Sequence, residues 1–296
     1  MIDVTNSVKV LFYNGSANFG DELNKTILPM YLGTDICHAP EKQADLVAIG
    51  SLLELLLHKG GHFSLRFARQ FMKPISIWGT GFIAPADTRI VRPGGLAEAT
   101  TREPKIFALR GELSLERMRT MTGRKLSSVA LGDPGLLCGK VNSFEPNKKT
   151  RRMQIGVIPH YVDKDTTQLA ALMTKLERAK LIDIQGSAKD VIEQVSKCDL
   201  ILSSAMHGLI AADALGIANI RVIFTDGLVG GDYKFNDYYS ALGVYQHRRL
   251  DLRVNQLRSS DLEVAREGYS LSCDTIEKVC ANLIAKADEM RRFICD

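Results

Sequence analysis

Short apolar runs alternate along the chain with segments in which apolar residues recur at helical spacing. Runs that are apolar on both faces are typical of strands in parallel sheets, which helices cover on both sides. The pattern therefore predicts an α/β protein with parallel sheets. The expected strands lie at 8–13, 46–49, 75–78, 106–109 and 129–131 in the first half of the chain, and at 153–158, 181–184, 200–202 and 220–224 in the second.

Two of the expected helices carry their own start signals. Ser187 followed by Asp190 is similar to a capping box and predicts a helix start. Asp274 with Glu277 does the same for the last helix of the chain. Because that helix has a continuous apolar face, we expect it to pack against another surface. The face consists of Ile276, Val279, Cys280, Leu283, Ile284 and Ala287.

The chain becomes polar and loses its periodicity between Gly139 and Arg152, which predicts a linker between two domains. We expect a Rossmann-like domain over residues 1–142, a second over 150–272, and a C-terminal helix over 273–296 that packs back across both. Ligands of such folds bind at the carboxyl ends of the parallel strands. The cleft between the two domains is therefore the expected site.

Composition and charge narrow the classes of function. Of the 296 residues, 45% are hydrophobic and 24% charged, which excludes a disordered chain. A net charge of +4, from 38 basic and 34 acidic residues, does not indicate a nucleic-acid partner. Six cysteines without C-x-x-C spacing predict reduced thiols rather than a zinc site or a disulfide framework. With no apolar run of about 18 residues and no secretory signal, we expect a cytoplasmic protein.

The turn after the first expected strand contains Asn18, Gly20 and Asp21. A glycine-bearing turn between a strand and a helix directs backbone N–H groups and the helix dipole at a bound anion. No Lys-Ser or Lys-Thr follows, so this is not a phosphate loop of the Walker type. An equally good interpretation is that these residues only form the turn and cap the helix.

The most suggestive pattern is a strand, a Ser203-Ser204 turn, and a helix of small residues with His207 near its first turn. The helix dipole lowers the pKa of an imidazole there, and a serine in the turn can cap the helix or contact an anion. We therefore expect His207 to exchange protons with a ligand. His160, which follows the first strand of the second half, is a companion candidate. The alternative is a histidine that only packs in the core.

Three turns that follow strands of the first half add weaker candidates. Arg110 can hold a phosphate or carboxylate, or can pair with a neighbouring glutamate at the surface. Asp133 precedes a Pro-Gly pair and is interpreted as a turn residue. Gly79 and Gly81 match G-x-G-x-x-A, but Pro85 prevents the helix that a dinucleotide pyrophosphate requires. A dehydrogenase is therefore the least favoured hypothesis.

Together these motifs resemble the polysaccharide pyruvyl transferase family. The matching segments are Asn-x-Gly-Asp at 18–21, an arginine after a strand at 110, Gly-Asp-Pro at 132–134, Ser-x-x-His-Gly at 204–208, and Lys-Phe-x-Asp at 234–237. They occur in the family's order along most of the chain. One position departs from the family's pattern, because Ala205 stands where the family has an arginine. Arg110, Arg221, Lys234 or one of the arginines at 248–249 can supply the missing positive charge.

The resemblance implies two Rossmann-like domains arranged as in GT-B glycosyltransferases. It implies transfer of the enolpyruvyl carbons of phosphoenolpyruvate onto a sugar as a ketal, in cell-surface polysaccharide synthesis. Phosphoenolpyruvate would be a co-substrate, with no cofactor and no metal, and the acceptor would be a sugar or a lipid-linked oligosaccharide. The first domain would take the acceptor and the second the donor. Peripheral contact with the inner face of the membrane and a homo-oligomer are left open.

The resemblance also assigns roles to residues. His207 and Asp21 would be the catalytic acid and base, in an order that the sequence leaves open. Residues that would bind the donor or substrate are Asn18, Gly20, Arg110, His160, Ser203, Ser204, Met206 and Lys234. Two alternatives remain: a GT-B glycosyltransferase that uses a nucleotide sugar, which would explain Ala205, and a non-catalytic descendant of the family.

Overall fold

The computed structural model describes residues 7–15, 18–57, 72–86, 98–141, 154–176 and 178–295. Its strands form two sheets in which all paired strands are parallel. The first sheet contains β1 (Val8–Leu11), β2 (Ile36–His38), β3 (Leu46–Val47), β4 (Ile75–Trp78), β5 (Pro104–Leu109) and β6 (Ala130–Leu131). The second contains β7 (Ile155–Ile158), β8 (Lys180–Leu181), β9 (Leu200–Ser203), β10 (Ala218–Ile223) and β11 (Arg249–Asp251). The predicted α/β class with parallel sheets is confirmed.

The two sheets share one strand order. The first runs β2-β1-β3-β4-β5-β6 and the second, read from its other edge, β8-β7-β9-β10-β11. In both, the second strand along the chain lies on one side of the first strand and the third lies on the other. Doubly wound folds have this order, and they bind ligands where the order reverses. The reversal falls between β1 and β3 in the first sheet and between β7 and β9 in the second.

Two strands were not among those predicted from the sequence. β2 and β11 are three-residue strands at sheet edges, and both include polar or charged residues. Short edge strands lack the continuous apolar run that marks a buried strand. The sequence pattern therefore identified the interior strands and missed these edges.

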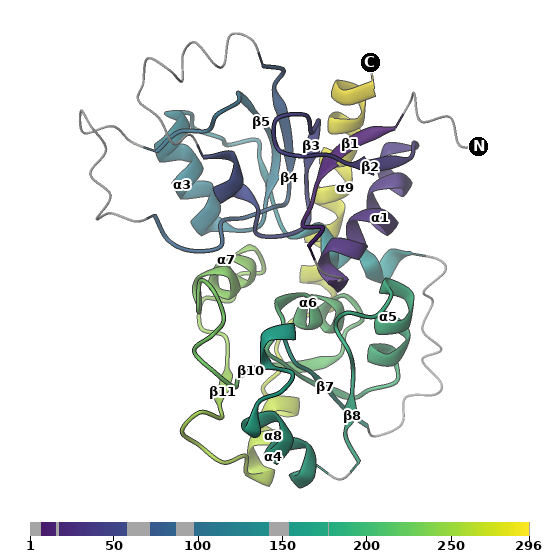
Figure 1. Ribbon diagram of the computed structural model, residues 1–296, viewed down its shortest axis with the longest axis vertical. Coiled ribbons are helices and arrows are strands. Elements are labelled where there is room, and N and C mark those ends of the chain that lie inside the picture. The colour runs from purple at the N-terminus through teal and green to yellow at the C-terminus, as the bar shows by residue number, and fades with distance from the viewer. Residues whose placement is uncertain are drawn as a thin grey trace.

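Helices cover both faces of each sheet (Figure 1). In the first sheet, α1 (Phe19–Leu32) and α9 (Cys273–Cys295) lie on one side and α3 (Glu112–Thr122) on the other. In the second, α5 (Ala188–Ser196) and α6 (Met206–Ala214) face the first sheet, whereas α4 (Thr167–Lys175) and α8 (Ser259–Glu267) lie on the far side. The remaining elements are α7 (Tyr233–Ala241) and the short 3-10 helices η2 (Leu53–Leu56), η3 (Pro134–Lys140) and η6 (Tyr161–Asp163).

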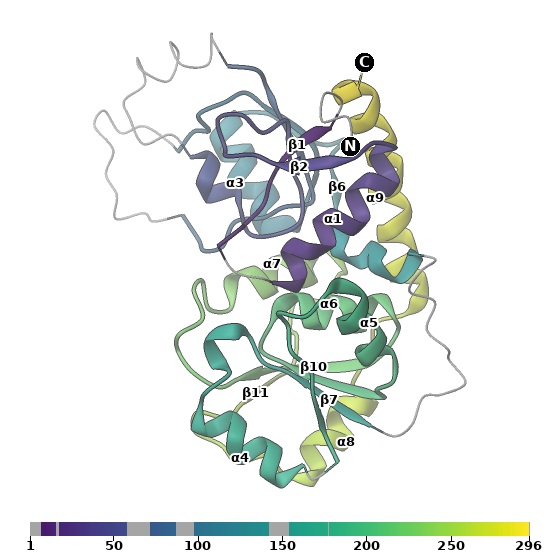
Figure 2. The ribbon, with the colours of Figure 1, turned by 45° about the vertical axis from the view of Figure 1, so that its right-hand side comes forward.

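The region between the two sheets is filled by side chains from both. Figures 1 and 2 show α6 and α7 between the sheets. One continuous apolar cluster includes Val10 and Trp78 of the first sheet, Leu209 of α6 and Leu283 of α9. Because a single core joins the two sheets, residues that follow strands of one sheet can contact residues that follow strands of the other.

The last helix is capped by a different residue from the one predicted. α9 begins at Cys273, and the Ser272 hydroxyl accepts a hydrogen bond from the Thr275 N–H at 3.1 Å, so Asp274 is not the cap. The helix packs on α1, β4, β5 and β6. By contrast, the Ser187 cap is confirmed, since its hydroxyl accepts from the Asp190 N–H at 3.2 Å.

The predicted linker overlaps residues 142–153, which lie outside the described residues, so the domain boundaries stay predictions. Among the helices that the structure describes, none is both long enough and apolar enough to cross a bilayer.

Candidate functional site

A cavity of about 280 Å³ lies where the strand order of both sheets reverses. Its walls come from the segments that follow β1, β3 and β4 in the first sheet and β7, β8 and β9 in the second, together with α7. It therefore occupies the edge at which doubly wound sheets bind ligands. Its lining residues are Tyr13, Asn18, Asp21, Gly50, Ser51, Leu52, Ile83, His160, Tyr161, Ile184, Ala205, Met206, His207 and Lys234.

Asp21 lies in the first turn of α1, at the first-sheet wall of the cavity. Its side chain is buried, and one carboxylate oxygen accepts a hydrogen bond from the Tyr13 N–H at 3.0 Å. Burial raises the pKa of Asp21 to about 7, although the Tyr13 hydrogen bond opposes this change. A carboxyl group that titrates near neutral pH can either donate or accept a proton.

His207 lies opposite, in the first turn of α6, and its side chain is 12% exposed. Burial, followed by the charges of Arg110 and Lys234, lowers the pKa of His207 to about 3. The free imidazole is therefore neutral at pH 7. The cavity thus joins two titratable groups whose pKa values are shifted in opposite directions, an arrangement typical of acid and base pairs.

The close approach of the two halves explains why residue 20 is a glycine. A Cβ atom built on Gly20 would lie 2.2 Å from His207 Nδ1, so any side chain there would collide with the imidazole. Asn18 caps α1 by accepting from the Gly20 N–H at 3.3 Å. The predicted turn at 18–21 therefore caps α1, and it also packs against the imidazole of His207 from the second half of the protein.

Lys234, in the first turn of α7, is the cation of the cavity. It is 8% exposed, and no hydrogen bond or ion pair joins its ammonium group to another described residue. Its Nζ atom lies 5.6 Å from the centre of the Phe235 ring. Burial, with the charges of Arg110 and Arg221, lowers the pKa of Lys234 to about 8. A buried ammonium without an anionic partner is suited to bind an anionic ligand.

Arg110, which the sequence analysis placed with the ligand, lies behind the cavity wall. It is fully buried, and its Nε atom pairs with the Asp237 carboxylate at 2.9 Å. A second nitrogen donates to the Ser51 hydroxyl at 2.5 Å. Asp237 also accepts from the N–H and the hydroxyl of Ser114 at 2.8 and 2.6 Å. Arg110 therefore fixes α7, which carries Lys234, against the first sheet.

Ser203 and Ser204 also lie outside the cavity lining, because their hydroxyls bind the protein itself. Ser203 donates to the backbone carbonyl of Ile158 at 2.8 Å. Ser204 donates to Asp163 at 2.7 Å and accepts from the His160 N–H at 2.8 Å. The two serines position the segment that carries His160, and their contact with a ligand anion stays a prediction.

Other predicted residues do reach the cavity. His160 and Met206 line it, and burial lowers the pKa of His160 to about 4. Two of the residues that could replace the family's arginine, Arg221 and Arg249, do not line the cavity. Arg221 pairs with Asp232 at 2.7 Å, and Arg249 pairs with the same carboxylate.

Three further residues lie at or beside the cavity without having been assigned a role in it: Asp133, which was interpreted as a turn residue, and Tyr13 and Tyr161. Asp133 is fully buried, and its Oδ2 atom lies 3.8 Å from His207 Nε2. Tyr13 and Tyr161 line the cavity from opposite sheets and are 52% and 40% exposed. The available signal was position alone, since all three follow the carboxyl end of a strand.

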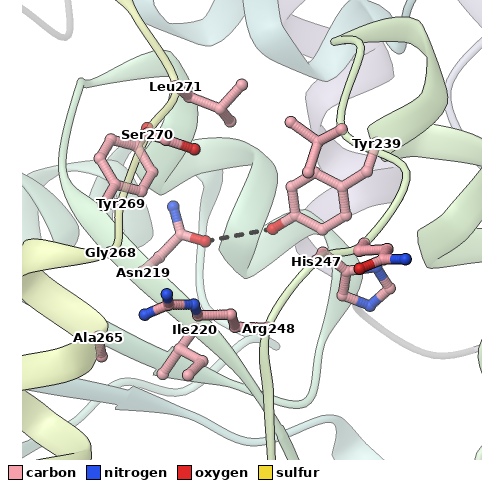
Figure 3. Close-up of a pocket in the computed structure, with 12 residues that line it drawn as sticks. Asn219, Ile220, Tyr239, His247, Arg248, Ala265, Gly268, Tyr269, Ser270 and Leu271 are labelled. Atoms are coloured by element: carbon pink, nitrogen blue, oxygen red, sulfur yellow. Dashed lines mark hydrogen bonds between the residues drawn. The ribbon is translucent and has the colours of Figure 1, made fainter.

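A second cavity of about 280 Å³ lies within the second sheet's half of the protein (Figure 3). Its lining residues include no carboxylate, and Tyr239 donates to the Asn219 side chain at 3.3 Å. It therefore offers no acid and base pair. Within the described residues, no group of three or more His, Cys, Asp or Glu side chains could hold a metal ion.

Comparisons with known proteins show two relatives that are similar in sequence. A mimivirus protein, L143 of Acanthamoeba polyphaga mimivirus, is 36% identical over 141 residues, which are 46% of this chain and 47% of that protein. The succinoglycan biosynthesis protein ExoV of Rhizobium meliloti (strain 1021) is 26% identical over 238 residues, or 79% of this chain and 64% of ExoV. The matches thus span about half to two thirds of these relatives' lengths.

A crystal structure of the protein KP1_0663 from Klebsiella pneumoniae aligns with a TM-score of 0.44 and 12% identity, over 79% of this chain and 87% of that one. The family model of polysaccharide pyruvyl transferases matches residues 3–223. This match includes Asp21, Asp133 and His207, the three titratable groups that the fold brings together from two sheets. The chain therefore belongs to the polysaccharide pyruvyl transferase family.

Proposed function

We propose that this protein transfers the pyruvyl group of phosphoenolpyruvate onto two hydroxyls of a sugar, forming a ketal. The observation that carries the proposal is the cavity in which Asp21, His207 and Lys234 meet. The reaction needs a proton donor, a proton acceptor and a cation that binds the donor's anionic groups. The three residues supply these functions from both sheets.

The donor's negative charge would be held by Lys234 and the first turn of α6. Backbone N–H groups and the dipole at a helix N-terminus favour anions. Lys234 has no anionic partner of its own among the described residues, so it can pair with a phosphate or carboxylate without breaking an existing ion pair. In this proposal Lys234 replaces the arginine that the family has at the position of Ala205.

The acid and base assignments follow from the pKa values of the two groups. Asp21, whose pKa is about 7, gives its proton to the methylene carbon of phosphoenolpyruvate. A sugar hydroxyl attacks the resulting cationic carbon, and neutral His207 takes the hydroxyl proton. The carbon–oxygen bond to phosphate then breaks, and the phosphate leaves with the proton from His207. A second hydroxyl attacks the same carbon to close the ketal, and its proton returns to Asp21.

The acceptor would contact the exposed rings of Tyr13 and Tyr161. A sugar ring presents C–H groups on its faces and hydroxyls at its edges, so an aromatic ring binds the face while polar groups bind the edge. The two tyrosines come from opposite sheets and lie beside the proton-transfer groups. In this proposal the acceptor lies between the two sheets, as in a GT-B-like arrangement, and contacts a tyrosine from each. Similarity to the succinoglycan biosynthesis protein ExoV supports a polysaccharide or its lipid-linked precursor as the acceptor.

Ligand-dependent melting temperatures and product analysis test this proposal. We expect phosphoenolpyruvate to raise the melting temperature of the wild-type protein, because a ligand that binds only the folded state stabilises it. The Lys234→Met variant should lose this response, whereas Lys175→Met should keep it, since Lys175 lies outside the cavity and donates to the Leu257 carbonyl.

The reaction itself is followed with phosphoenolpyruvate labelled with ¹³C at the carbon that becomes the ketal centre. With a suitable oligosaccharide acceptor, phosphate release and a labelled ketal should appear together. Stabilisation by nucleotide sugars but not by phosphoenolpyruvate would contradict the proposal and favour a glycosyltransferase.

A further inference from the structure

Two buried polar atoms face each other beside the cavity, and neither has a hydrogen-bond partner among the described residues. They are Asp133 Oδ2 and His207 Nε2, at a distance of 3.8 Å. Buried polar groups in proteins are nearly always hydrogen-bonded, and an unpaired one often marks a functional contact. Here the two atoms, one from each half of the protein, are a carboxylate oxygen, which accepts, and an imidazole nitrogen, which donates when it carries the proton.

Asp133 is held in place by its own segment. It follows β6 at the start of η3, and its Oδ1 atom accepts from the Gly135 N–H at 2.8 Å. The carboxylate is 0% exposed, so Oδ2 has no access to solvent. Because Oδ1 already fixes the rotamer, Oδ2 points at the imidazole from a fixed position.

The imidazole also has close neighbours on two sides. Its edge with Nδ1 and Cε1 lies over Gly20, and its Cδ2 atom lies near Gly135, where a built Cβ would be 3.6 Å away. His207 thus packs between Gly20 and Gly135, two glycines of the first half of the protein, and its Nε2 atom is directed at Asp133. In this orientation Nε2 faces the carboxylate and Nδ1 lies on the opposite side of the ring.

We infer that Asp133 is the positioning residue of His207: its Oδ2 atom accepts the Nε2–H bond and leaves Nδ1, the ring nitrogen over Gly20, unprotonated. This fixes the neutral tautomer that can act as a base. When Nδ1 takes a proton, the carboxylate also stabilises the imidazolium. That last step rests on the proposed function, whereas the tautomer does not. Contacts between catalytic groups are often long in a free enzyme and shorten when a ligand binds.

Other charged groups around the ring cannot take this role. Arg110 and Lys234 are cations, and after burial, which is the main cause, their charges and that of His160 lower the pKa of His207. Asp21 lines the cavity on the side of the ligand, where the proposed function uses it as an acid. Asp237, the carboxylate that raises the pKa of Asp133, is itself paired with Arg110. Burial raises the pKa of Asp133 to about 6, so its carboxyl group is mainly ionised at pH 7.5.

The Asp133→Asn variant tests the inference. Asparagine keeps the shape and the acceptor for the Gly135 N–H, but it directs an N–H donor at Nε2. His207 must then accept at Nε2 and carry its proton on Nδ1, which removes the base. We expect kcat to fall by at least about tenfold while KM for phosphoenolpyruvate changes less than about threefold.

Long-range ¹H–¹⁵N spectra of histidine-labelled protein identify the tautomer of His207 in the absence of any substrate. We expect the Nε2–H tautomer for His207 in the wild type and the Nδ1–H tautomer in Asp133→Asn, with the His207→Gln variant assigning the signal. Asp213→Asn is the matched control, because Asp213 is an equally buried aspartate on α6 that does not contact His207. It should leave the His207 tautomer and the pH profile of kcat unchanged.

The outcomes separate the two proposals. A wild-type Nδ1–H tautomer, or a folded Asp133→Asn variant with unchanged kcat, would overturn the role of Asp133. The wild-type spectrum decides this even if the variant does not fold. Absence of any pyruvyl transfer with the expected tautomers would overturn the proposed function and leave the Asp133 and His207 pair intact.

Discussion

The two ends of α6 are both buried, but the polar groups at these ends differ in their hydrogen bonding. At the carboxyl end, Asp213 is fully buried and accepts three hydrogen bonds, at 2.6, 2.8 and 3.0 Å. The donors are Asn219, Tyr238 and Tyr269. At the amino end, His207 Nε2 and the facing Asp133 Oδ2 have no hydrogen-bond partner among the described residues.

Burial shifts the pKa of a group at each end. It raises the pKa of Asp213 to about 6 and lowers that of His207 to about 3. Only the amino end borders the cavity of Asp21 and Lys234, and the Lys234 ammonium has no ion pair with any other described residue. A shifted pKa alone therefore does not identify a site. The ends differ in how the shifted group is bonded: three donors satisfy Asp213, whereas among the described residues His207 Nε2 and Asp133 Oδ2 have no partner and face each other at 3.8 Å beside the cavity.

The largest expected effect is the loss of activity in His207→Ala. If His207 is the base, kcat should fall by about 10²- to 10⁴-fold, because the variant loses general base catalysis. The measurement is the initial rate of phosphate release with saturating substrates. Circular dichroism checks that the variant is folded, and an unchanged kcat in a folded variant would mean that the amino end of α6 has no catalytic role.

Asp213→Asn should change the pH dependence of stability and leave activity unchanged. The pKa of Asp213 is about 6 in the folded protein and 3.8 for an aspartate in an unfolded chain, so the folded state binds the proton more tightly and protonation favours folding. This contribution is complete below pH 3.8 and is lost as the pH rises through 6. Relative to the variant, the wild type should lose about 3 kcal/mol of unfolding free energy between pH 4 and pH 7.

Urea unfolding at several pH values measures this difference. The unfolding free energies of the wild type and Asp213→Asn could instead depend on pH in the same way. That result would show that the hydrogen bonds from the three donors compensate for burial of the carboxyl group whether it is ionised or neutral. A large loss of kcat in a folded Asp213→Asn variant would show that the carboxyl end of α6 also takes part in catalysis.

Lys234→Met should raise KM for phosphoenolpyruvate by about 10- to 100-fold, the usual effect of losing one charge-assisted hydrogen bond. Its apolar stem is retained, so we expect little change in stability. KM for the acceptor sugar should not change. An equal loss in kcat and no change in KM would place Lys234 in the transition state rather than in donor binding.

The smallest expected effect belongs to the tyrosines at the rim. Tyr161→Ala should raise KM for the acceptor by about three- to tenfold, because an aromatic contact contributes about 1 kcal/mol. Tyr161→Phe keeps the ring and should be nearly normal. Tyr245→Ala, which removes an exposed ring outside the cavity, is the matched control. Equal effects of all three substitutions would show that stacking on this ring does not select the acceptor.

The sequence pattern identified most of the strands and the edge at which ligands bind. Interior strands are apolar on both faces, so they stand out from their surroundings, and the residues after them can be assigned to one edge. Asp21, His160 and His207 were placed at the cavity in this way. The role of Asp133 could not be recognised, because an aspartate before Pro-Gly is also the ordinary residue of a turn.

What the sequence by itself determined was local: where strands and helices occur, that the sheets are parallel, and which residues follow the strand ends. Only the tertiary structure decided which of those residues face the cavity and which face one another. Arg110 pairs with Asp237, which lies 127 residues away in the sequence. His207 faces Asp133, although the two residues follow strands of different sheets. Hydrophobic periodicity reports the burial of each segment, whereas such pairings depend on how two sheets pack around one core.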